Sequence, residues 1–158
     1  MAVSFIREYF VLKQIYLFWV CIENNKTNIM KIFSEEWIKD YSEKLSANKS
    51  FKQAADDWYI KLVLTIDDEE NKNVFLDLEN GECKSARIAN NADIENADYI
   101  ISASKDSWKK ILNNELDPML AVMTKKLELK KGNVGSLLKY IDAAKELLKS
   151  ASQVNTEF

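Results

Sequence analysis

The spacing of apolar residues predicts regular helices and strands from about residue 30 onward. Ser34 is a suitable N-cap for a helix that extends to about Asn48. The apolar face of this helix consists of Trp37, Ile38, Tyr41 and Leu45. A short second helix at 50–56 leads into a strand at 58–66, in which apolar residues alternate with more polar ones.

The next segment predicts an antiparallel meander. A charged loop at 67–73 separates the first strand from a second at 74–79. Asn80-Gly81 is a two-residue hairpin turn, and a third strand follows at 82–88. We therefore expect three consecutive antiparallel strands.

The second half of the chain continues the sheet and adds helices. Residues 89–97 are polar and irregular, a fourth strand is expected at 98–103, Ser104 caps a helix, and Asn133 caps a terminal helix. The apolar residues are Trp108, Ile111 and Leu112 in the first helix, Leu127 and Leu129 in a fifth strand, and Val134, Leu137, Leu138, Ile141 and Leu148 in the terminal helix. The pattern predicts an α+β fold with one five-stranded, mainly antiparallel sheet and helices on one face.

Composition agrees with a single folded domain. The chain has 158 residues, and 47% of them are hydrophobic. Three glycines and one proline favour long regular elements over a loop-rich fold. We expect three segments: an extension at 1–29, a domain at 30–150 and a polar tail at 151–158.

The segment at 1–29 is rich in aromatic residues at helical spacing. Its uncharged run is shorter than the roughly 20 residues that span a bilayer, and no signal-peptide cleavage site follows it. Three interpretations remain open: a helix that docks on the domain, a helix on a membrane surface, and an upstream extension with Met30 as the true start.

Several chemistries are disfavoured by what the chain contains. A net charge of −3 argues against nucleic-acid binding. The chain has no histidine, the commonest general base and metal ligand. Cys21 and Cys83 match no zinc or redox spacing and suit a reducing compartment, where we interpret them as core residues. We therefore expect no enzyme activity, no metal and no cofactor.

A dense unit from Asn114 to Asn133 carries the most information. It combines a proline, a run of adaptable apolar residues, a short alternating strand and a glycine that opens a helix. The strand Ala97–Ser104, a Trp-bearing helix, Leu116-Asp-Pro118 and the unit's later residues resemble the sterol carrier protein type-two (sterol-binding) domain family. Those later residues are Ala121-Val-Met123, Lys126-Leu-Glu-Leu129 and Gly132-Asn133.

The resemblance covers about residues 30–150 and is strongest between 97 and 138. Family members usually have glycine before the Leu-Asp-Pro element and in the turn ahead of the Lys-Leu strand. This chain has Asn114 or Glu115 at the first position and Lys125 at the second. The resemblance implies an apolar tunnel between the sheet and its helices that holds sterols, fatty acids, acyl-CoA or phospholipids.

An apolar pocket with flexible thioether side chains suits varied lipids, although the same residues are equally consistent with ordinary core. We expect the tunnel lining to be Trp108, Ile111, Leu112, Met119, Val122, Met123, Leu127, Leu129, Leu137, Leu138 and Ile141.

The lysines around the fifth strand have two interpretations. By alternation, Lys126 and Lys130 form a solvated strand surface. Alternatively, an anionic head group binds at the start of the terminal helix. The candidates for this head-group site are Lys130, Lys131, Gly132 and Asn133.

The expected function is lipid binding and transfer without catalysis. One alternative is an accessory domain that presents a lipophilic substrate, such as an isoprenoid quinone intermediate, to a partner enzyme. A second is a small steroid- or acyl-converting enzyme that uses Asp98, Tyr59 and Tyr99. A lipid or fatty acyl ligand and transient membrane contact are the expected interactions, and the sequence leaves open a partner enzyme or a homodimer through the exposed sheet face. Asn155-Thr-Glu-Phe158 does not match a Ser-Lys-Leu address, so a cytoplasmic location is expected.

Overall fold

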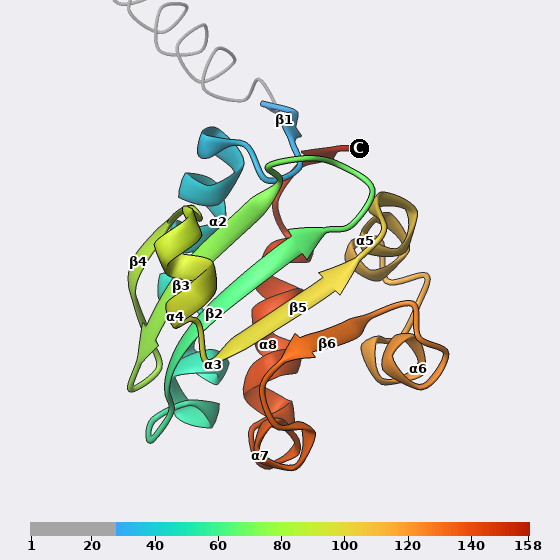
Figure 1. Ribbon diagram of the computed structural model, residues 1–158. Helices are drawn as coiled ribbons and strands as arrows, with labels where there is room; N and C mark the ends of the chain where they lie inside the picture. The colour runs from blue at the N-terminus through green and yellow to red at the C-terminus, as the bar shows by residue number, and fades with distance from the viewer. Residues whose placement is uncertain (1–27) are drawn as a thin grey trace, which may run out of the picture.

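The computed structural model describes residues 28–158, which form a five-stranded main sheet with a layer of helices against it (Figure 1). The aromatic-rich segment predicted at 1–29, Cys21 included, lies outside the described residues except for its last two positions. The strands of the sheet are β2 (Tyr59–Ile66), β3 (Asn73–Glu79), β4 (Glu82–Ile88), β5 (Tyr99–Ala103) and β6 (Glu128–Lys131). This arrangement confirms the predicted α+β class.

The strand order is β4-β3-β2-β5-β6. β2, β3 and β4 form the predicted antiparallel meander, with Leu62 opposite Leu76. β5 pairs with β2 in parallel, and β6 pairs with β5 in antiparallel orientation. The sheet is therefore mixed but mainly antiparallel, as the sequence predicts.

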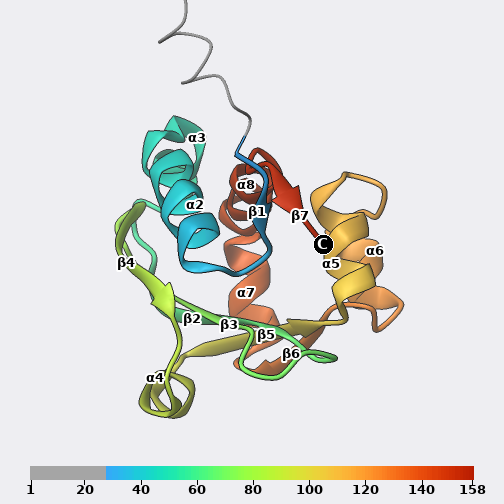
Figure 2. The same cartoon turned by 90° about the horizontal axis from the view of Figure 1, so that it is seen from above.

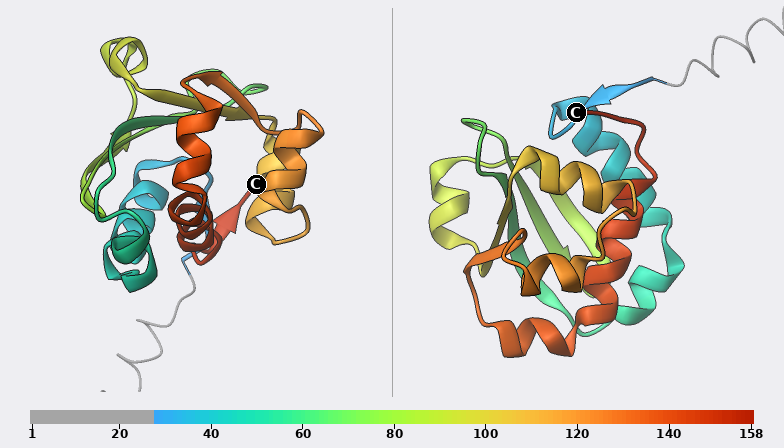
Figure 3. Two further views of the ribbon diagram at one scale, coloured as in Figure 1. Left: turned by 90° about the horizontal axis from the view of Figure 1, so that it is seen from below. Right: turned by 90° about the vertical axis from the view of Figure 1, so that its right-hand side faces the viewer.

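Most helices lie on one face of the sheet, as Figure 2 and Figure 3 show from above and below. They are α2 (Glu35–Ala47), α3 (Lys49–Ala54), α5 (Lys105–Leu112), α6 (Pro118–Met123), α7 (Val134–Lys139) and α8 (Ile141–Ser152). The predicted caps are present, because the side chains of Ser34, Ser104 and Asn133 each accept a hydrogen bond from a backbone N–H three residues later. Local sequence signals therefore set where these helices begin.

The predicted single terminal helix is two helices, α7 and α8. Tyr140 separates them with φ −107° and ψ 28°, which is not helical backbone. Its ring stacks on Trp58 with ring centroids 5.0 Å apart. The helix is therefore interrupted at the residue that stacks on Trp58, and the spacing of apolar residues does not predict this interruption.

The segment 89–97, predicted to be irregular, contains the helix α4 (Asn91–Asn96). α4 lies on the opposite face of the sheet from the other helices (Figure 2). It begins with a reciprocal capping box between Asn90 and Asp93, which is the local signal that periodicity misses in so short a helix. Arg87 pairs with Asp93, and this guanidinium lowers the pKa of the carboxyl group.

The ends of the described region lie together. β1 (Met30–Lys31) pairs in parallel with β7 (Thr156–Glu157). The segment 151–158, predicted as a polar tail, places Ala151 and Val154 in the core and supplies β7. Two buried apolar side chains within a mostly polar stretch are too weak a pattern to predict this docking.

Left-handed backbone occurs at non-glycine residues on both sides of α6. Asn114 has φ 59° and Lys125 has φ 55°. Of the two residues compared with a family glycine at the first turn, Asn114 has the positive φ and Glu115 does not. Asparagine tolerates this conformation better than lysine does, so the strain is greater at Lys125.

Replacing Lys125 by glycine should stabilise the protein. Relief of the left-handed strain outweighs the added flexibility of the unfolded chain, so Lys125→Gly should raise the free energy of unfolding by about 0.5–1 kcal/mol. Thermal and denaturant unfolding measure this change. Lys126→Gly is the matched control, because Lys126 has no positive φ and should lose stability instead. Equal effects of the two substitutions would contradict the strain argument.

Candidate functional site

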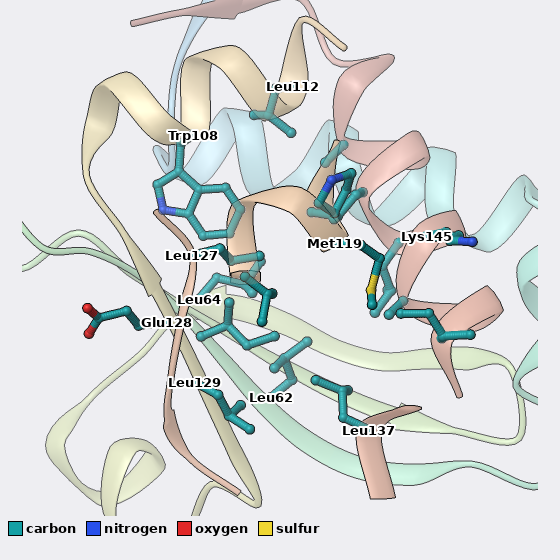
Figure 4. A pocket seen from close by; sticks show the side chains of 18 of the residues that line it. Leu62, Leu64, Trp108, Leu112, Met119, Leu127, Glu128, Leu129, Leu137 and Lys145 are labelled. Carbon is teal, nitrogen blue, oxygen red and sulfur yellow. The ribbon is translucent and has the colours of Figure 1, made fainter. Parts of the chain in front are cut away.

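An apolar pocket lies between the inner face of the sheet and the helices α6, α7 and α8 (Figure 4). Alternate residues of β2 form its floor, and Leu127 and Leu129 continue it at the edge of the sheet. Met119 and Val122 of α6 face Leu137, Ile141 and Leu148 of the last two helices. The cavity measures about 100 Å³. Its lining suits an apolar body and offers few groups for directional bonding.

The polar side chains at the pocket are few and lie at its boundary. The Tyr41 hydroxyl donates to the carbonyl oxygen of Leu147 at 3.2 Å, and burial raises the pKa of Tyr41. Glu128 pairs with Lys130, and its carboxylate points away from the apolar side chains (Figure 4). Lys145 is exposed at another part of the boundary. This set supplies no acid and base facing one another.

One end of the pocket is built by an aromatic cluster, comprising Phe33, Trp37, Tyr41 and Trp108. The ring of Phe33 lies 5.3 Å from that of Trp37 and 5.6 Å from that of Trp108, measured between centroids. Trp37 Nε1 donates to Thr156 Oγ1 at 2.8 Å, and Trp108 Nε1 donates to the carbonyl of Thr65 at 2.9 Å. The cluster thus joins segments from both ends of the described chain.

Most of the predicted lining residues meet at this pocket. Eight of the candidates line it: Trp108, Leu112, Met119, Val122, Leu127, Leu129, Leu137 and Ile141. Ile111 is buried in the core without lining the pocket, and Met123 and Leu138 are exposed. Apolar spacing identifies the helices correctly, but the side that faces the cavity depends on how each short helix is rotated.

Residues from the first half of the chain also line the pocket, and none of them is among the lining residues predicted from the sequence. The aromatic cluster residues of α2, and Trp58, Ile60, Leu62 and Leu64 at β2, also line the pocket. The alternation in β2 was a usable signal, because Ile60, Leu62 and Leu64 share one face of the strand. The alternation does not indicate which helices cover that face, and only the tertiary structure shows them.

The four head-group candidates do not line the pocket. Lys130 pairs with Glu128, and Lys131 Nζ donates to the carbonyl of Glu95 at 2.7 Å. Asn133 caps α7 by accepting from Ser136 N at 3.0 Å. Gly132 has φ 111°, and a Cβ atom there would lie 2.3 Å from Cδ1 of Tyr99. Gly132 therefore permits close packing of the backbone on the Tyr99 ring.

The residues considered for catalysis do not assemble into a site. Tyr59 is exposed, Asp98 accepts from Lys61 N at 2.8 Å, and Tyr99 packs against Gly132. Burial raises the pKa of the Cys83 thiol to about 11, so this thiol is protonated at neutral pH. Within residues 28–158, histidine, cysteine and carboxylate side chains form no group of three that could hold a metal ion.

The family model that matches the chain is the SCP-2 sterol transfer family, and the match covers residues 38–145. The chain belongs to this family. The matched segment contains most of the pocket lining, from Tyr41 in α2 to Lys145 in α8. Family membership therefore assigns the domain to lipid binding and transfer as a class, and it agrees with the sheet and the layer of helices observed.

Solved structures support the same assignment. A crystal structure of sterol carrier protein 2 is 32% identical, covers 78% of this chain and 99% of its own, and gives a TM-score of 0.70. The solution structure of a conserved Thermus thermophilus protein is also 32% identical. It covers 81% of this chain and 92% of its own, with a TM-score of 0.68. A UbiJ-SCP2 ubiquinone synthesis protein is 12% identical with a TM-score of 0.51, covers 71% and 87%, and shows the shared fold.

Comparison with curated protein sequences gives no match. None of the helices between residues 28 and 158 has the length and apolar character needed to cross a membrane.

Gly132→Ala should destabilise the domain. Both the positive φ and the overlap with the Tyr99 ring oppose a Cβ atom, so we expect a loss of about 1–3 kcal/mol in the free energy of unfolding. A double-mutant cycle with Tyr99→Leu separates the two causes, because removing the ring should recover part of the loss. If the two substitutions are additive, the ring contact is not the reason for glycine.

Proposed function

We propose that the protein reversibly binds a lipid with an elongated apolar body in this pocket and carries it without changing it chemically. The observation that supports this most directly is the lining, which is apolar except at its boundary. An apolar body gains free energy by leaving water for such a surface, at about 25 cal/mol per Å² buried. The absence of histidine and of facing acid and base groups supports carriage over catalysis.

Binding a whole acyl chain requires the pocket to widen. Its volume of about 100 Å³ is smaller than that of ligand sites, which commonly measure about 300–1,000 Å³. α7 has no buried residue and α6 has one, Ala121, so these helices are less constrained by packing than α2 or α5. We expect α6 and α7 to move outward when a ligand enters.

Leu137→Gln should weaken binding of a fluorescent fatty acid by about tenfold, because it replaces apolar lining with an amide that lacks a partner in the pocket. Leu138→Gln is the matched control, because Leu138 is the adjacent residue but is exposed and does not line the pocket. Affinity is measured by fluorescence titration and by displacement with unlabelled fatty acid.

Native mass spectrometry of the purified protein adds an independent measurement. A retained lipid and competitive displacement would support the carrier function. A protein that retains no lipid and shows no displacement would defeat it, and conversion of the bound lipid into a product would favour the converting enzyme.

Lys145 is a second candidate for contact with an anionic head group, beside Lys130 and Lys131. It is the cation that borders the pocket. Lys145→Glu should lower affinity for a fatty acid severalfold more than for its methyl ester, since the ester lacks the negative charge. The double variant Lys130→Glu/Lys131→Glu tests the earlier candidates in the same assay. Equal losses for acid and ester would contradict a charge-specific contact.

Presentation of a lipophilic substrate to a partner enzyme remains the second candidate function. The structural neighbour named as a ubiquinone synthesis protein favours including it, since the two share a fold. A stable protein that co-elutes with the full chain would support this function. Subcellular fractionation tests the proposed cytoplasmic location.

A further inference from the structure

We propose that α6, α7 and the loop after α6 form a docking surface for a lipid bilayer that carries negative charge. This inference rests on the proposed lipid-carrier function. The surface consists of exposed apolar side chains on α6 and α7, which we call the rim patch, and of the lysines that follow α6. The rim patch comprises Leu120, Val122, Met123, Val134 and Leu138, whose exposed fractions range from 42% to 78%.

The rim patch is continuous with the pocket wall. Val122 of α6 and Val134 of α7 are exposed to solvent and also line the cavity. An apolar path therefore runs from the cavity lining to the protein surface between these helices. A lipid that moves along this path into a bilayer would expose less of its apolar body to water than one released elsewhere. This continuity favours a lipid surface as the occupant.

The charge near the rim patch suits an anionic surface. Lys125 and Lys126 follow α6 directly, and both are exposed. Neither lysine lies at ion-pair distance from a carboxylate of the described residues. From Asn114 to Lys145 the sequence has six lysines and four acidic residues, although the whole chain has a net charge of −3.

Three of those four acidic residues already have partners, because Glu115 accepts a hydrogen bond from Asn113 Nδ2 at 3.3 Å. Asp117 accepts hydrogen bonds from the backbone of Met119 and Leu120 at the start of α6, and Glu128 pairs with Lys130. The local excess of positive charge therefore lies beside the exposed apolar side chains. Exposed apolar side chains together with lysines are the combination by which peripheral proteins bind anionic membranes.

Co-sedimentation of the full chain with lipid vesicles tests the proposal. We expect binding to vesicles of phosphatidylcholine with phosphatidylglycerol, and weaker binding to phosphatidylcholine alone. Lys125→Glu/Lys126→Glu should lower binding to the anionic vesicles at least about tenfold, given roughly fivefold per lysine near a charged surface. Met123→Gln/Leu138→Gln should lower binding to both kinds of vesicle.

Matched controls lie on α2, α3 and β4, away from the rim patch (Figure 1). Ile88→Gln changes an aliphatic side chain that is 42% exposed, like Val122, and Lys39→Glu/Lys49→Glu reverses two exposed lysines. These variants should bind vesicles as the unaltered chain does. Circular dichroism confirms that every variant is folded.

Fatty-acid titration without vesicles separates this proposal from the carrier function. Met123 and Leu138 do not line the pocket, so Met123→Gln/Leu138→Gln should keep the affinity for a fluorescent fatty acid while losing vesicle binding. Vesicle binding that the rim variants and the control variants retain equally would overturn the docking surface, whatever the titration shows. A dimer that dissociates in the rim variants alone would assign the patch to a second copy of the chain and would also overturn it.

Discussion

Three buried aromatic side chains at one end of the pocket each carry a polar atom that needs a partner away from water. Trp37 donates a hydrogen bond to Thr156 Oγ1, Tyr41 to the carbonyl oxygen of Leu147, and Trp108 to the carbonyl oxygen of Thr65. A buried donor left without an acceptor costs about 1–3 kcal/mol, so these bonds hold α2 against α8 and β7, and they hold α5 against β2. The aromatic cluster is consequently the more firmly packed end of the pocket, because α6 has one buried residue and α7 has none.

The sequence predicts most of the sheet because alternation in β2, the Asn80-Gly81 turn and the helix caps are local signals. It also predicts eight lining residues, since the second half of the chain supplies amphipathic segments with a recognisable order. The opposite-face helix α4 was missed because its signal is a capping box without apolar periodicity. The aromatic contribution of α2 to the pocket depends on packing between distant segments, which local patterns do not contain.

The left-handed turns on either side of α6 are formed without glycine. Asn114 and Lys125 sit on either side of α6, and both keep a positive φ. The short helix α6 is connected to α5 and β6 through these turns, and only one of its residues is buried. Because few of its side chains are packed in the core, we expect that α6 can move as a rigid unit while the turns bend.

The parallel pairing of β2 with β5 has a consequence for how the domain folds. In the meander of β2, β3 and β4, each strand pairs with the next strand along the chain. β5 pairs with β2 although β3, β4 and α4 lie between them in the sequence. Contacts between residues distant in sequence form more slowly than local ones. We expect the meander to assemble first and the segments from β5 to α8 to dock afterwards. The pocket would then be completed late in folding. Until that step, the apolar face of the partly formed sheet would be exposed to water.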